Sequence, residues 1–364
     1  MVGSESMTLR VAIYTICLNE RAFVERWVSA HKDHAIMVVA DTGSTDGTPE
    51  ALRELGVQVH DVHVKPWRFD DARNTALALV PAHVDVCISV DMDELMAPGW
   101  YDALCKSWTP QTTRLRYTYV WSFDAQDQPA HSFMGDKCHA RQNYRWKRPV
   151  HETVFHTGGT PELTTTAPEV IMWHKQDRGK SRGAYLPLLE LSHAENPACS
   201  QTLFWLAREY AYHNKNEQAV AEFKKYLDMP HATWHEERAE AHRWLSKLLP
   251  HDKLYHLRMA TAIAPMKREP WMDLADHYYQ VTDWPSCYAH ALQALQITRK
   301  SGTYLDSVEA WGAKIPDLAG IAAFNMHLYD QAIKWFEQAV QLNPQDVRLQ
   351  NNLKFARQKL GGHT

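Results

Sequence analysis

The chain has 364 residues, of which 45% are hydrophobic and 23% are charged, a composition that excludes wholesale disorder. Its 39 Lys and Arg residues against 43 Asp and Glu residues give a formal net charge of −4, which argues against a protein that coats nucleic acid with its whole surface. Six Cys residues are scattered without a Cys-x-x-Cys pair, so neither a disulfide framework nor a zinc site is predicted.

The sequence predicts no membrane segment. No apolar run approaches the roughly 18 residues needed to span a bilayer, and the N-terminus lacks the apolar core of a signal peptide. Residues 1–8 are expected to be a disordered leader or an expression remnant and are left out of the fold. We therefore expect a cytoplasmic protein.

Short apolar runs alternate with helical stretches over the first half of the chain. They predict strands at residues 11–16, 36–40, 57–64, 84–90 and 115–123. Helices are predicted at about residues 20–31, from Thr48 onward and at 70–79, with Thr48 as a good N-cap. Strands that alternate with helices imply a mainly parallel sheet, and ligands bind such sheets beyond the carboxyl ends of the strands.

Strand signals stop near residue 184, and a step of 34 residues takes their place. The tetratricopeptide pattern sets a large apolar residue, Leu, a small residue and an aromatic residue before a later Ala, aromatic, Ala and Pro. Its matches are Leu203, Leu206, Ala207, Tyr210, Ala219, Phe223 and Pro230 in a first unit; Trp244, Ala260 and Pro265 in a degenerate second; Trp271, Leu274, Ala275, Tyr278 and Ala294 in a third; and Gly320, Ala323, Ala332, Phe336, Ala339 and Pro344 in a last. The alternative is an irregular helical bundle with accidental spacing.

The last of these units begins eleven residues late, which predicts an insertion around residues 301–311. Residues 346–360 are polar enough to form the capping helix that the end of a solenoid requires. The fold class is therefore expected to be α/β at residues 9–183, followed by an all-α tetratricopeptide-like array at residues 184–364.

An acidic turn with two glycines, residues 41–48, follows the second strand. Glycine allows the positive-φ geometry of a tight turn, and Asp41 at the strand end faces the crevice where ligands bind. Asp, Ser and Gly occur in any turn, so a purely structural role is the alternative.

Asp91 and Asp93 follow the fourth strand. At an extended strand end, residues i and i+2 point to the same side, so both carboxylates are expected to meet one ligand. Two hard oxygen donors at that point suit Mg²⁺ or Mn²⁺ bound to a diphosphate. A solvated acidic turn is the alternative.

Arg73 and Asn74 lie near the start of a predicted helix between the third and fourth strands. Arg can fork onto phosphate oxygens or pack against a base. The alternative for Arg73 is a surface ion pair with Asp70, three residues earlier.

Together these features resemble the family-two glycosyltransferases of the GT-A fold over roughly residues 9–175. The resemblance rests on an ordered set of segments: Leu18-Asn19-Glu20, residues 41–48, Ala72-Arg73-Asn74 and Asp91-Met92-Asp93. A tetratricopeptide array behind such a domain is similar to a subgroup that includes bacterial peptide and protein glycosyltransferases. The implied fold is a Rossmann-like GT-A domain that binds a nucleotide sugar, with the helical array behind it.

The resemblance also implies a role for each residue of these segments. The residues implied to bind the nucleotide sugar are Asp41 at the nucleobase, Asn19 and Glu20 lining the nucleotide pocket, Arg73 and Asn74 near the base or diphosphate, and Asp91 near the ribose. Asp93 would lie on the metal, Mn²⁺ or Mg²⁺.

Family-two enzymes invert the sugar, so a general base is expected to deprotonate the acceptor as it attacks the anomeric carbon. An aromatic and basic stretch after the fifth strand ends in His151 and Glu152. We assign Glu152 as the base and His151 as the residue that orients it or helps the acceptor, with Asp136 as the rival base. The alternative for Glu152 is a salt bridge to Arg148 or Lys147.

Two further features follow this stretch. An apolar run at residues 170–174 closes on His174, and in related transferases a His after the catalytic segment completes the metal site. The basic, glycine-containing loop at residues 177–183 is expected to close over the diphosphate, with an interdomain linker as the alternative.

The predicted function is that of a metal-dependent enzyme that moves a sugar from a nucleoside diphosphate sugar, UDP-linked by family habit, to a macromolecular acceptor. The array favours a peptide or protein acceptor and also offers a homodimer contact. DNA that carries a modified base is the second choice, because residues 137–148 interleave basic and aromatic side chains. The alternative function is a non-catalytic adaptor whose repeats bind a partner while a vestigial domain holds nucleotide. A sugar-nucleotide hydrolase or nucleotidyltransferase is a third option.

Overall fold

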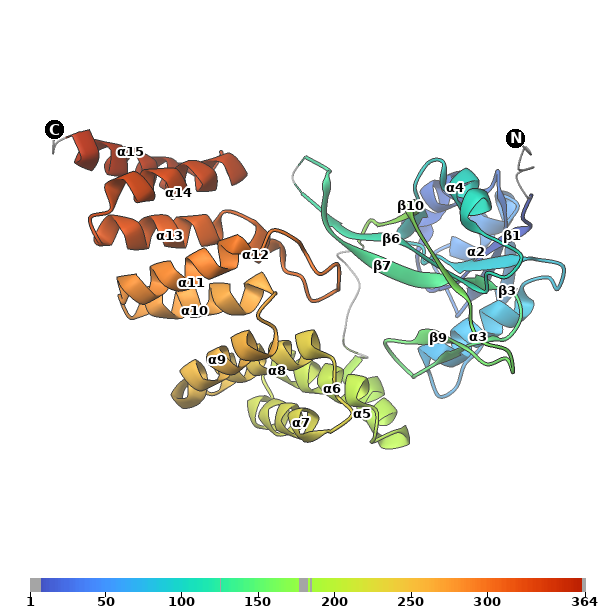
Figure 1. The fold of residues 1–364 in the computed structure, drawn as a ribbon. Coiled ribbons are helices and arrows are strands. Elements are labelled where there is room, and N and C mark those ends of the chain that lie inside the picture. Colours follow the sequence, from blue (N-terminus) through green and yellow to red (C-terminus); the bar gives the residue numbers. More distant parts are fainter. Residues whose placement is uncertain (1–7, 125, 177–182, 184, 362–364) are drawn as a thin grey trace. The chain divides into compact units, whose positions relative to one another are not determined.

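A computed structural model describes residues 8–124, 126–176, 183 and 185–361 (Figure 1). Contacts divide the chain into two units, Met1–Glu195 and Asn196–Thr364. The division lies after helix α5 (Tyr185–Glu195), whereas the sequence analysis places it after residue 183. Each unit is described by itself.

The first unit is built on an eight-stranded sheet in the order β3-β2-β1-β4-β7-β6-β10-β5. Its strands are β1 (Val11–Cys17), β2 (Ala35–Asp41), β3 (Gln58–Asp61), β4 (Val86–Ser89), β5 (Glu94–Met96), β6 (Arg114–Phe123), β7 (Pro129–Ala140) and β10 (Thr164–His174). The neighbours β1–β2, β2–β3, β1–β4 and β6–β10 are parallel, and β4–β7, β6–β7 and β5–β10 are antiparallel.

The sheet is therefore mixed rather than mainly parallel, and the prediction of a mainly parallel sheet is wrong for its second half. Strand β7, which creates two of the antiparallel pairs, contains Pro, Gly, Asp and Lys, and no β-branched residue. Such a segment carries little strand propensity of its own, so its sequence does not mark it as a strand. It forms because β4 and β6 offer hydrogen-bonding edges on both of its sides.

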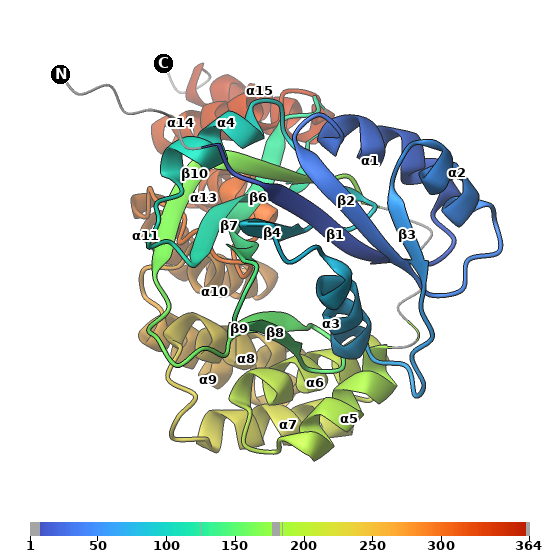
Figure 2. The same ribbon diagram turned by 90° about the vertical axis from the view of Figure 1, so that its right-hand side faces the viewer.

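Each face of the sheet packs a separate hydrophobic core, because successive side chains of a strand point to opposite faces. Along β1, Val11 and Ile13 pack with α1 (Val24–His31), α2 (Thr48–Glu54) and α4 (Trp100–Ser107). On the other face, Ala12 and Tyr14 pack with α3 (Phe69–Leu79) and with the hairpin of β8 (Tyr144–Lys147) and β9 (Thr153–His156). Figure 2 shows α3 beside this hairpin, away from α1 and α2.

Helix α2 begins one residue away from the expected cap. Gly47 is the N-cap in a left-handed conformation (φ 85°), and Thr48 is the first helical residue. The Thr48 hydroxyl donates to Oδ1 of Asp46 and accepts from the backbone N–H of Glu20 at 2.9 Å. Thr48 thus joins the loop after β1 to the turn after β2.

The second unit is a tetratricopeptide-like array of helices. The helices are α6 (Ser200–Tyr212), α7 (Asn216–Asp228), α8 (His235–Leu248), α9 (Lys253–Ile263), α10 (Arg268–Gln280), α11 (Trp284–Gln296), α12 (Val308–Trp311), α13 (Lys314–Asn325), α14 (Tyr329–Leu342) and α15 (Val347–Gly361). The small residues of the repeat pattern lie where helices meet: a Cβ built on Gly320 would lie 2.6 Å from the ring of Phe336. Within the described residues, no helix is both long and apolar enough to cross a membrane.

Two histidines are buried together between α8 and α9. Nδ1 of His242 lies 2.9 Å from Nδ1 of His256, so one ring donates and the other accepts, and protonation of both would set two donors face to face. Burial, together with the nearby His256 and Arg238, lowers the pKa of His242 to about 4. Burial also lowers the pKa of His256.

We expect acid to destabilise the protein through this pair. Because the pKa of His242 is lower in the folded than in the unfolded chain, the stability that it contributes is present above about pH 6.5 and is lost as the pH falls towards 4; the loss is about 3 kcal/mol. His242→Asn should flatten the pH dependence of the unfolding midpoint over that range, measured by circular dichroism on the whole chain. His235→Asn, at an exposed His, is the control. Identical slopes for His242→Asn and the wild type would contradict the expectation.

Candidate functional site

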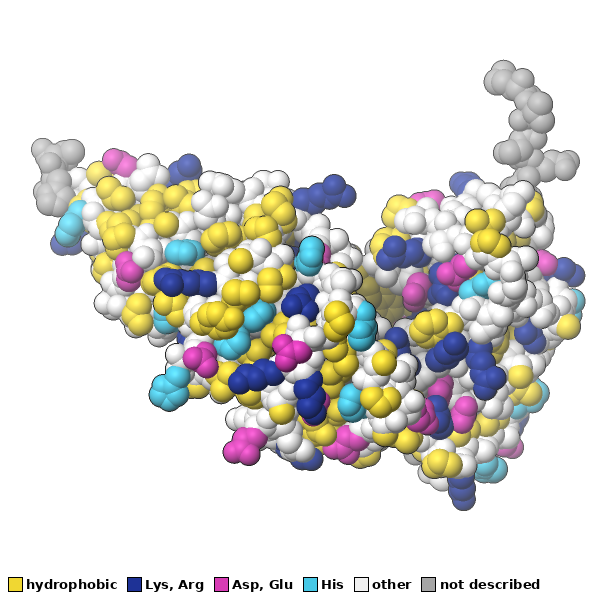
Figure 3. All heavy atoms as spheres, turned by 60° about the horizontal axis from the view of Figure 1, so that its bottom comes forward, with side chains coloured by type: hydrophobic (Ala, Val, Ile, Leu, Met, Phe, Trp, Pro, Cys, Tyr) yellow, Lys and Arg dark blue, Asp and Glu magenta, His cyan; other side chains and the backbone are white. Residues whose placement is uncertain are grey.

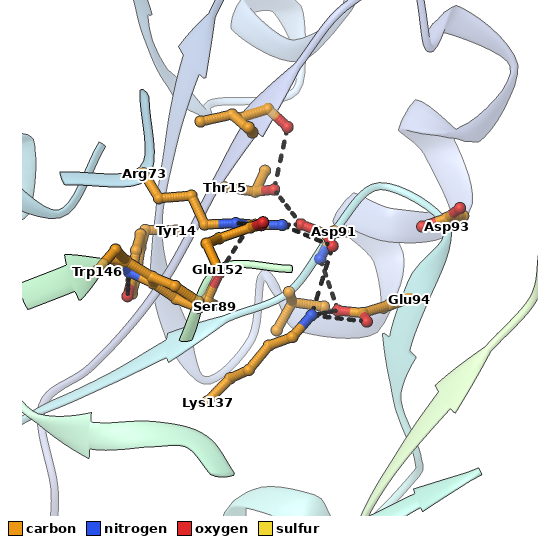
Figure 4. Close-up of polar contacts among 12 residues, drawn as sticks. Tyr14, Thr15, Arg73, Ser89, Asp91, Asp93, Glu94, Lys137, Trp146 and Glu152 are labelled. Atoms are coloured by element: carbon orange, nitrogen blue, oxygen red, sulfur yellow. Dashed lines mark hydrogen bonds and ion pairs between the residues drawn. The ribbon is translucent and has the colours of Figure 1, made fainter. Parts of the chain in front are cut away.

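Polar and charged side chains gather beyond the carboxyl ends of β1, β2 and β4. At the centre is Arg73 on α3, whose guanidinium donates to both carboxylate oxygens of Asp91, at 2.7 and 3.0 Å (Figure 4). Its Nε donates to Oε1 of Glu152 at 2.5 Å. Three residues that the sequence analysis singled out separately therefore form one buried ion cluster.

This cluster keeps Arg73 charged despite its burial. Burial alone would lower the pKa of Arg73, but the charges of Asp91 and Glu152 outweigh that effect and hold the pKa well above its ordinary value. The guanidinium also donates to the Ser89 hydroxyl at 3.1 Å and lies over the Trp146 ring, with 5.0 Å between its carbon and the ring centroid. The alternative pairing of Arg73 with Asp70 does not occur, because Asp70 accepts from Arg68.

Asp91 receives donors on both of its oxygens. Besides Arg73, the Thr15 hydroxyl donates to Oδ1 at 3.3 Å and Nζ of Lys137 lies 3.4 Å from Oδ2. A carboxylate offers about four lone-pair positions. Four donors approach the carboxylate of Asp91: two N–H groups of Arg73, the Thr15 hydroxyl and Nζ of Lys137.

Lys137 and Glu94 complete the ion cluster, and the sequence analysis assigned neither a role in it. Nζ of Lys137, on β7, lies 2.9 Å from Oε1 of Glu94, and the Tyr119 hydroxyl donates to the same oxygen at 2.6 Å. Burial would lower the pKa of Lys137, but the charges of Asp91 and Glu94 raise it above its ordinary value. Glu94 directly follows the acidic pair in the sequence, a signal that could have pointed to it, whereas nothing near Lys137 marks its role.

The two acids of the Asp91–Asp93 pair point in different directions, so the expectation that they share one side of an extended strand end is wrong. Strand β4 ends at Ser89, and a turn follows in which the backbone N–H of Glu94 donates to the carbonyl of Asp91 at 2.8 Å. The turn removes the alternation that an extended strand would impose. Figure 4 shows Asp91 facing Arg73 and Lys137, with Asp93 turned away from them.

Asp93 meets His174 instead. Oδ2 of Asp93 lies 3.7 Å from Nε2 of His174, the last residue of β10. The His174 ring packs against Trp121, with 4.5 Å between the ring centroids. Two residues predicted as metal ligands thus lie together although 81 positions separate them.

Asp93 and His174 suit a metal site that is shared with a substrate. Their oxygen and imidazole nitrogen are donors that Mn²⁺ accepts. Within the part of the chain that the structure describes, no group of three or more His, Cys, Asp or Glu side chains is arranged to hold a metal. Substrate oxygens and water would therefore have to supply the remaining ligands, as is usual for Mg²⁺ on phosphates. Nδ1 of His174 is buried, and no described residue accepts a hydrogen bond from it, whereas most metal-binding histidines donate from their second ring nitrogen to such an acceptor.

Asp41 holds its own turn together. Its oxygens accept from the backbone N–H groups of Gly43 and Ser44 at 3.0 and 2.9 Å and from the Ser44 hydroxyl at 2.5 Å. Burial would raise its pKa, but these hydrogen bonds hold the pKa of Asp41 below its ordinary value. The carboxylate is therefore ionised and fixed at the strand end.

Asn19 and Glu20 connect the loop after β1 to the same turn. Asn19 adopts a left-handed conformation (φ 55°), and its Oδ1 accepts from the backbone N–H of Thr45 at 2.7 Å. The backbone N–H of Asn19 donates to the Ser44 hydroxyl at 2.8 Å. Glu20 is buried beside them. Asn19 and Glu20, predicted to line a nucleotide pocket, thus connect the loop after β1 to the turn after β2.

Asn74 is used in holding α3 against the hairpin. Its amide donates to the carbonyl of Trp146 and accepts from the N–H of the same residue, both at 2.9 Å. The pair fixes Trp146 below Arg73. The amide is therefore engaged with the backbone in this conformation.

The other candidates near Glu152 lie at different places. His151 adopts a left-handed conformation (φ 48°), and its ring contacts Tyr185 at 5.6 Å between centroids. The side chain of Asp136, the rival base, is 55% exposed and lies 3.7 Å from Arg114. Glu152 pairs with Arg73 rather than with Arg148 or Lys147. Residues 177–182 of the predicted loop over the diphosphate lie outside the described residues.

No family model matches the chain. A TPR repeat-containing protein of Synechococcus elongatus is 28% identical over 148 residues, which are 40% of this chain and 35% of that protein. The chain thus spans about a third of the relative that it matches. Among solved structures, a thermophilic TPR protein of Thermus thermophilus is 20% identical (TM-score 0.32; 47% of this chain, 88% of that chain) and MamA is 14% identical (TM-score 0.37; 44% and 82%). YrrB, a TPR protein with an unusual peptide-binding site, is 13% identical (TM-score 0.37; 46% and 81%).

We expect Arg73→Met to destabilise the first unit strongly. The change leaves the two partly buried carboxylates of Asp91 and Glu152 without their common cation, so the free energy of unfolding should fall by about 3 kcal/mol. Urea unfolding of the whole chain measures it. Arg53→Met, which breaks the exposed pair with Asp61, is the matched control and should change stability by less than about 1 kcal/mol. Equal effects of the two substitutions would refute the central position of Arg73.

Proposed function

We propose that the first unit is a metal-dependent glycosyltransferase that moves a sugar from a nucleoside diphosphate sugar to a macromolecular acceptor. The observation that carries the proposal is the convergence of Arg73, Asp91 and Glu152 at the carboxyl ends of β1 and β4, with the Asp93–His174 pair beside them. Ligands of sheets with parallel strands bind at that edge. The resemblance of the segments around these residues to family-two transferases supports the same activity.

The chemistry that we propose divides among few residues. A divalent cation bound to Asp93 and His174 would neutralise charge on the diphosphate. Glu152 would accept the proton of the acceptor as the acceptor atom forms a bond to the anomeric carbon, while the bond from that carbon to the diphosphate oxygen breaks and its electron pair leaves with the diphosphate. The ion pair with Arg73 would hold the Glu152 carboxylate in place for this role.

We expect donor binding to depend on Asp93. A panel of nucleoside diphosphate sugars with Mn²⁺, followed by thermal shift, should give a stabilising donor, and a uracil nucleotide is expected. Asp93→Asn should remove that stabilisation because a neutral amide binds a divalent cation poorly. Asp33→Asn, at an exposed Asp of the same unit, is the control.

Product analysis separates the remaining reactions. Sugar recovered on the acceptor supports transfer, whereas donor turnover without any acceptor-linked sugar points to a hydrolase or nucleotidyltransferase. If the wild type is stabilised by no donor in the panel, the proposed activity is wrong.

The acceptor that we favour is a peptide or protein. The DNA alternative rests on the basic and aromatic residues at 137–148, and two of these cations are engaged within the unit: Lys137 with Asp91 and Glu94, and Arg141 with the carbonyl of Val80. On the face drawn in Figure 3, Lys and Arg side chains lie among Asp and Glu side chains in both units rather than in one basic field. A mixed surface of this kind suits proteins better than a polyanion.

A second candidate function, the adaptor, is favoured by the helical array. A groove of about 560 Å³ between α13, α14 and α15 has an apolar floor and a polar rim. It is lined by Ile321, Phe324, Phe336 and Phe355 together with Asn352, Gln358 and Lys359. Phe355 is 58% exposed, as an aromatic residue that meets a partner would be. The relative in Synechococcus elongatus, named for its TPR repeats, agrees with this candidate.

The two functions predict different effects of substitutions in the two units. If the chain is an adaptor, Phe355→Ala should reduce the recovery of bound proteins at least fivefold in quantitative affinity mass spectrometry, and Asp93→Asn should leave both recovery and cellular function unchanged. Tyr255→Ala, at an exposed aromatic residue of α9, is the control. If Asp93→Asn abolishes both sugar transfer and cellular function, the adaptor candidate is excluded.

A further inference from the structure

We propose that Lys137 is a positioning residue of this site: with Glu94 it keeps Asp91 turned toward Arg73, so that Asp93 is the acid of the pair that faces the donor. The inference rests on the proposed function, since it names which residues prepare that site for an anionic donor. It concerns a lysine on β7, outside the segments that carry the resemblance.

The first step is the turn between β4 and β5, which Glu94 holds in place. Glu94 is 2% exposed, and a buried carboxylate is costly unless donors surround it. One of its oxygens accepts from the backbone N–H of Asp91 at 2.9 Å, and the other accepts from the Tyr119 hydroxyl at 2.6 Å. Glu94 therefore fixes the backbone of Asp91 relative to β6.

The second step is the side chain of Asp91, which Lys137 holds. Nζ of Lys137 lies 2.9 and 3.2 Å from the two oxygens of Glu94 and 3.4 Å from Oδ2 of Asp91, so one ammonium group bridges both acids. Lys137 comes from β7 and Arg73 from α3, which places a cation on each side of Asp91. Asp91 cannot turn toward the edge of the sheet without losing one of them.

The third step follows from the number of donors. Two donors of Arg73, the ammonium group of Lys137 and the Thr15 hydroxyl surround the carboxylate of Asp91. Three of these four contacts come from cations, so a ligand hydroxyl or a metal ion meets a carboxylate that is already paired with charge. Asp93, on the other side of the turn, lies beside His174 and away from both cations (Figure 4).

Removal of the positive charge of Lys137 should affect anion binding and cation binding in opposite directions. Without Lys137, Asp91 and Glu94 lose a shared cation, and the local potential becomes more negative. A diphosphate is then repelled more strongly, whereas a divalent cation is attracted at least as strongly as before. A variant that merely unfolds the site would weaken both ligands together.

The experiment compares Lys137→Met, Lys137→Arg and the control Lys147→Met, an exposed lysine on β8, in the whole chain. Calorimetry measures uridine diphosphate with saturating Mn²⁺, and electron paramagnetic resonance measures Mn²⁺ alone, at a temperature where every variant is folded. We expect Lys137→Met to weaken uridine diphosphate at least tenfold and to leave Mn²⁺ binding equal or tighter. Lys137→Arg should restore nucleotide affinity to within threefold, and the control should match the wild type.

Other outcomes overturn the inference. If Lys137→Met changes nucleotide affinity less than threefold, or weakens nucleotide and Mn²⁺ to the same degree, Lys137 does not position this site. If the wild type binds neither ligand, the proposed function fails. A double-mutant cycle of Lys137→Met with Asp91→Asn, measured by urea unfolding, then tests the contact between Lys137 and Asp91 by itself. A coupling of fivefold or more in the unfolding equilibrium constant upholds the contact between Lys137 and Asp91, and a smaller one refutes it.

Discussion

The compensation of one buried cation shapes the first unit. The guanidinium of Arg73, in the middle of α3, is buried, and such a group is tolerated only where acids and hydrogen-bond acceptors surround it. Asp91 comes from the loop after β4 and Glu152 from the segment before β9, so the requirement ties α3, the sheet and the hairpin together. The pairing of Asn74 with Trp146 places an aromatic face under the same guanidinium. The position of these acids at the sheet edge is thus a condition of the fold as well as of any chemistry.

The parts of the fold that could be predicted are those in which local pattern and burial agree. Strands β1, β2 and β4 are apolar runs that become buried strands, and the repeat pattern of small and aromatic residues corresponds to helix pairs such as α6 and α7. Strand β7 could not be predicted, because its conformation depends on two neighbours rather than on its own residues. Two of the three antiparallel pairs of the sheet involve that strand, so its local sequence could not reveal them.

In the candidate site, the sequence identified residues but not their partners. Glu152 has two cations close to it in the sequence, Arg148 and Lys147, yet its partner is Arg73, 79 positions away. Likewise, spacing alone puts Asp91 and Asp93 on one side, and a turn that begins two residues after Ser89 separates them. Ion pairing depends on which elements meet across the sheet, and that information is distributed over the whole chain. The sequence also gives no reason to single out Lys137 as a partner of Asp91, because only the position of β7 in the sheet brings the two together.

The side chains around Arg73 and those around Asp93 differ in how closely they contact their partners. Around Asp41, Asn19 and Arg73, hydrogen bonds between 2.5 and 3.1 Å hold the side chains in place. Between Asp93 and His174 the distance is 3.7 Å, longer than a hydrogen bond, so these two donors approach each other without closing the gap. Fixed charges that need no reorganisation are the arrangement that stabilises developing charge most efficiently. A rigid ion cluster around Arg73 therefore lies beside the more widely spaced pair of Asp93 and His174.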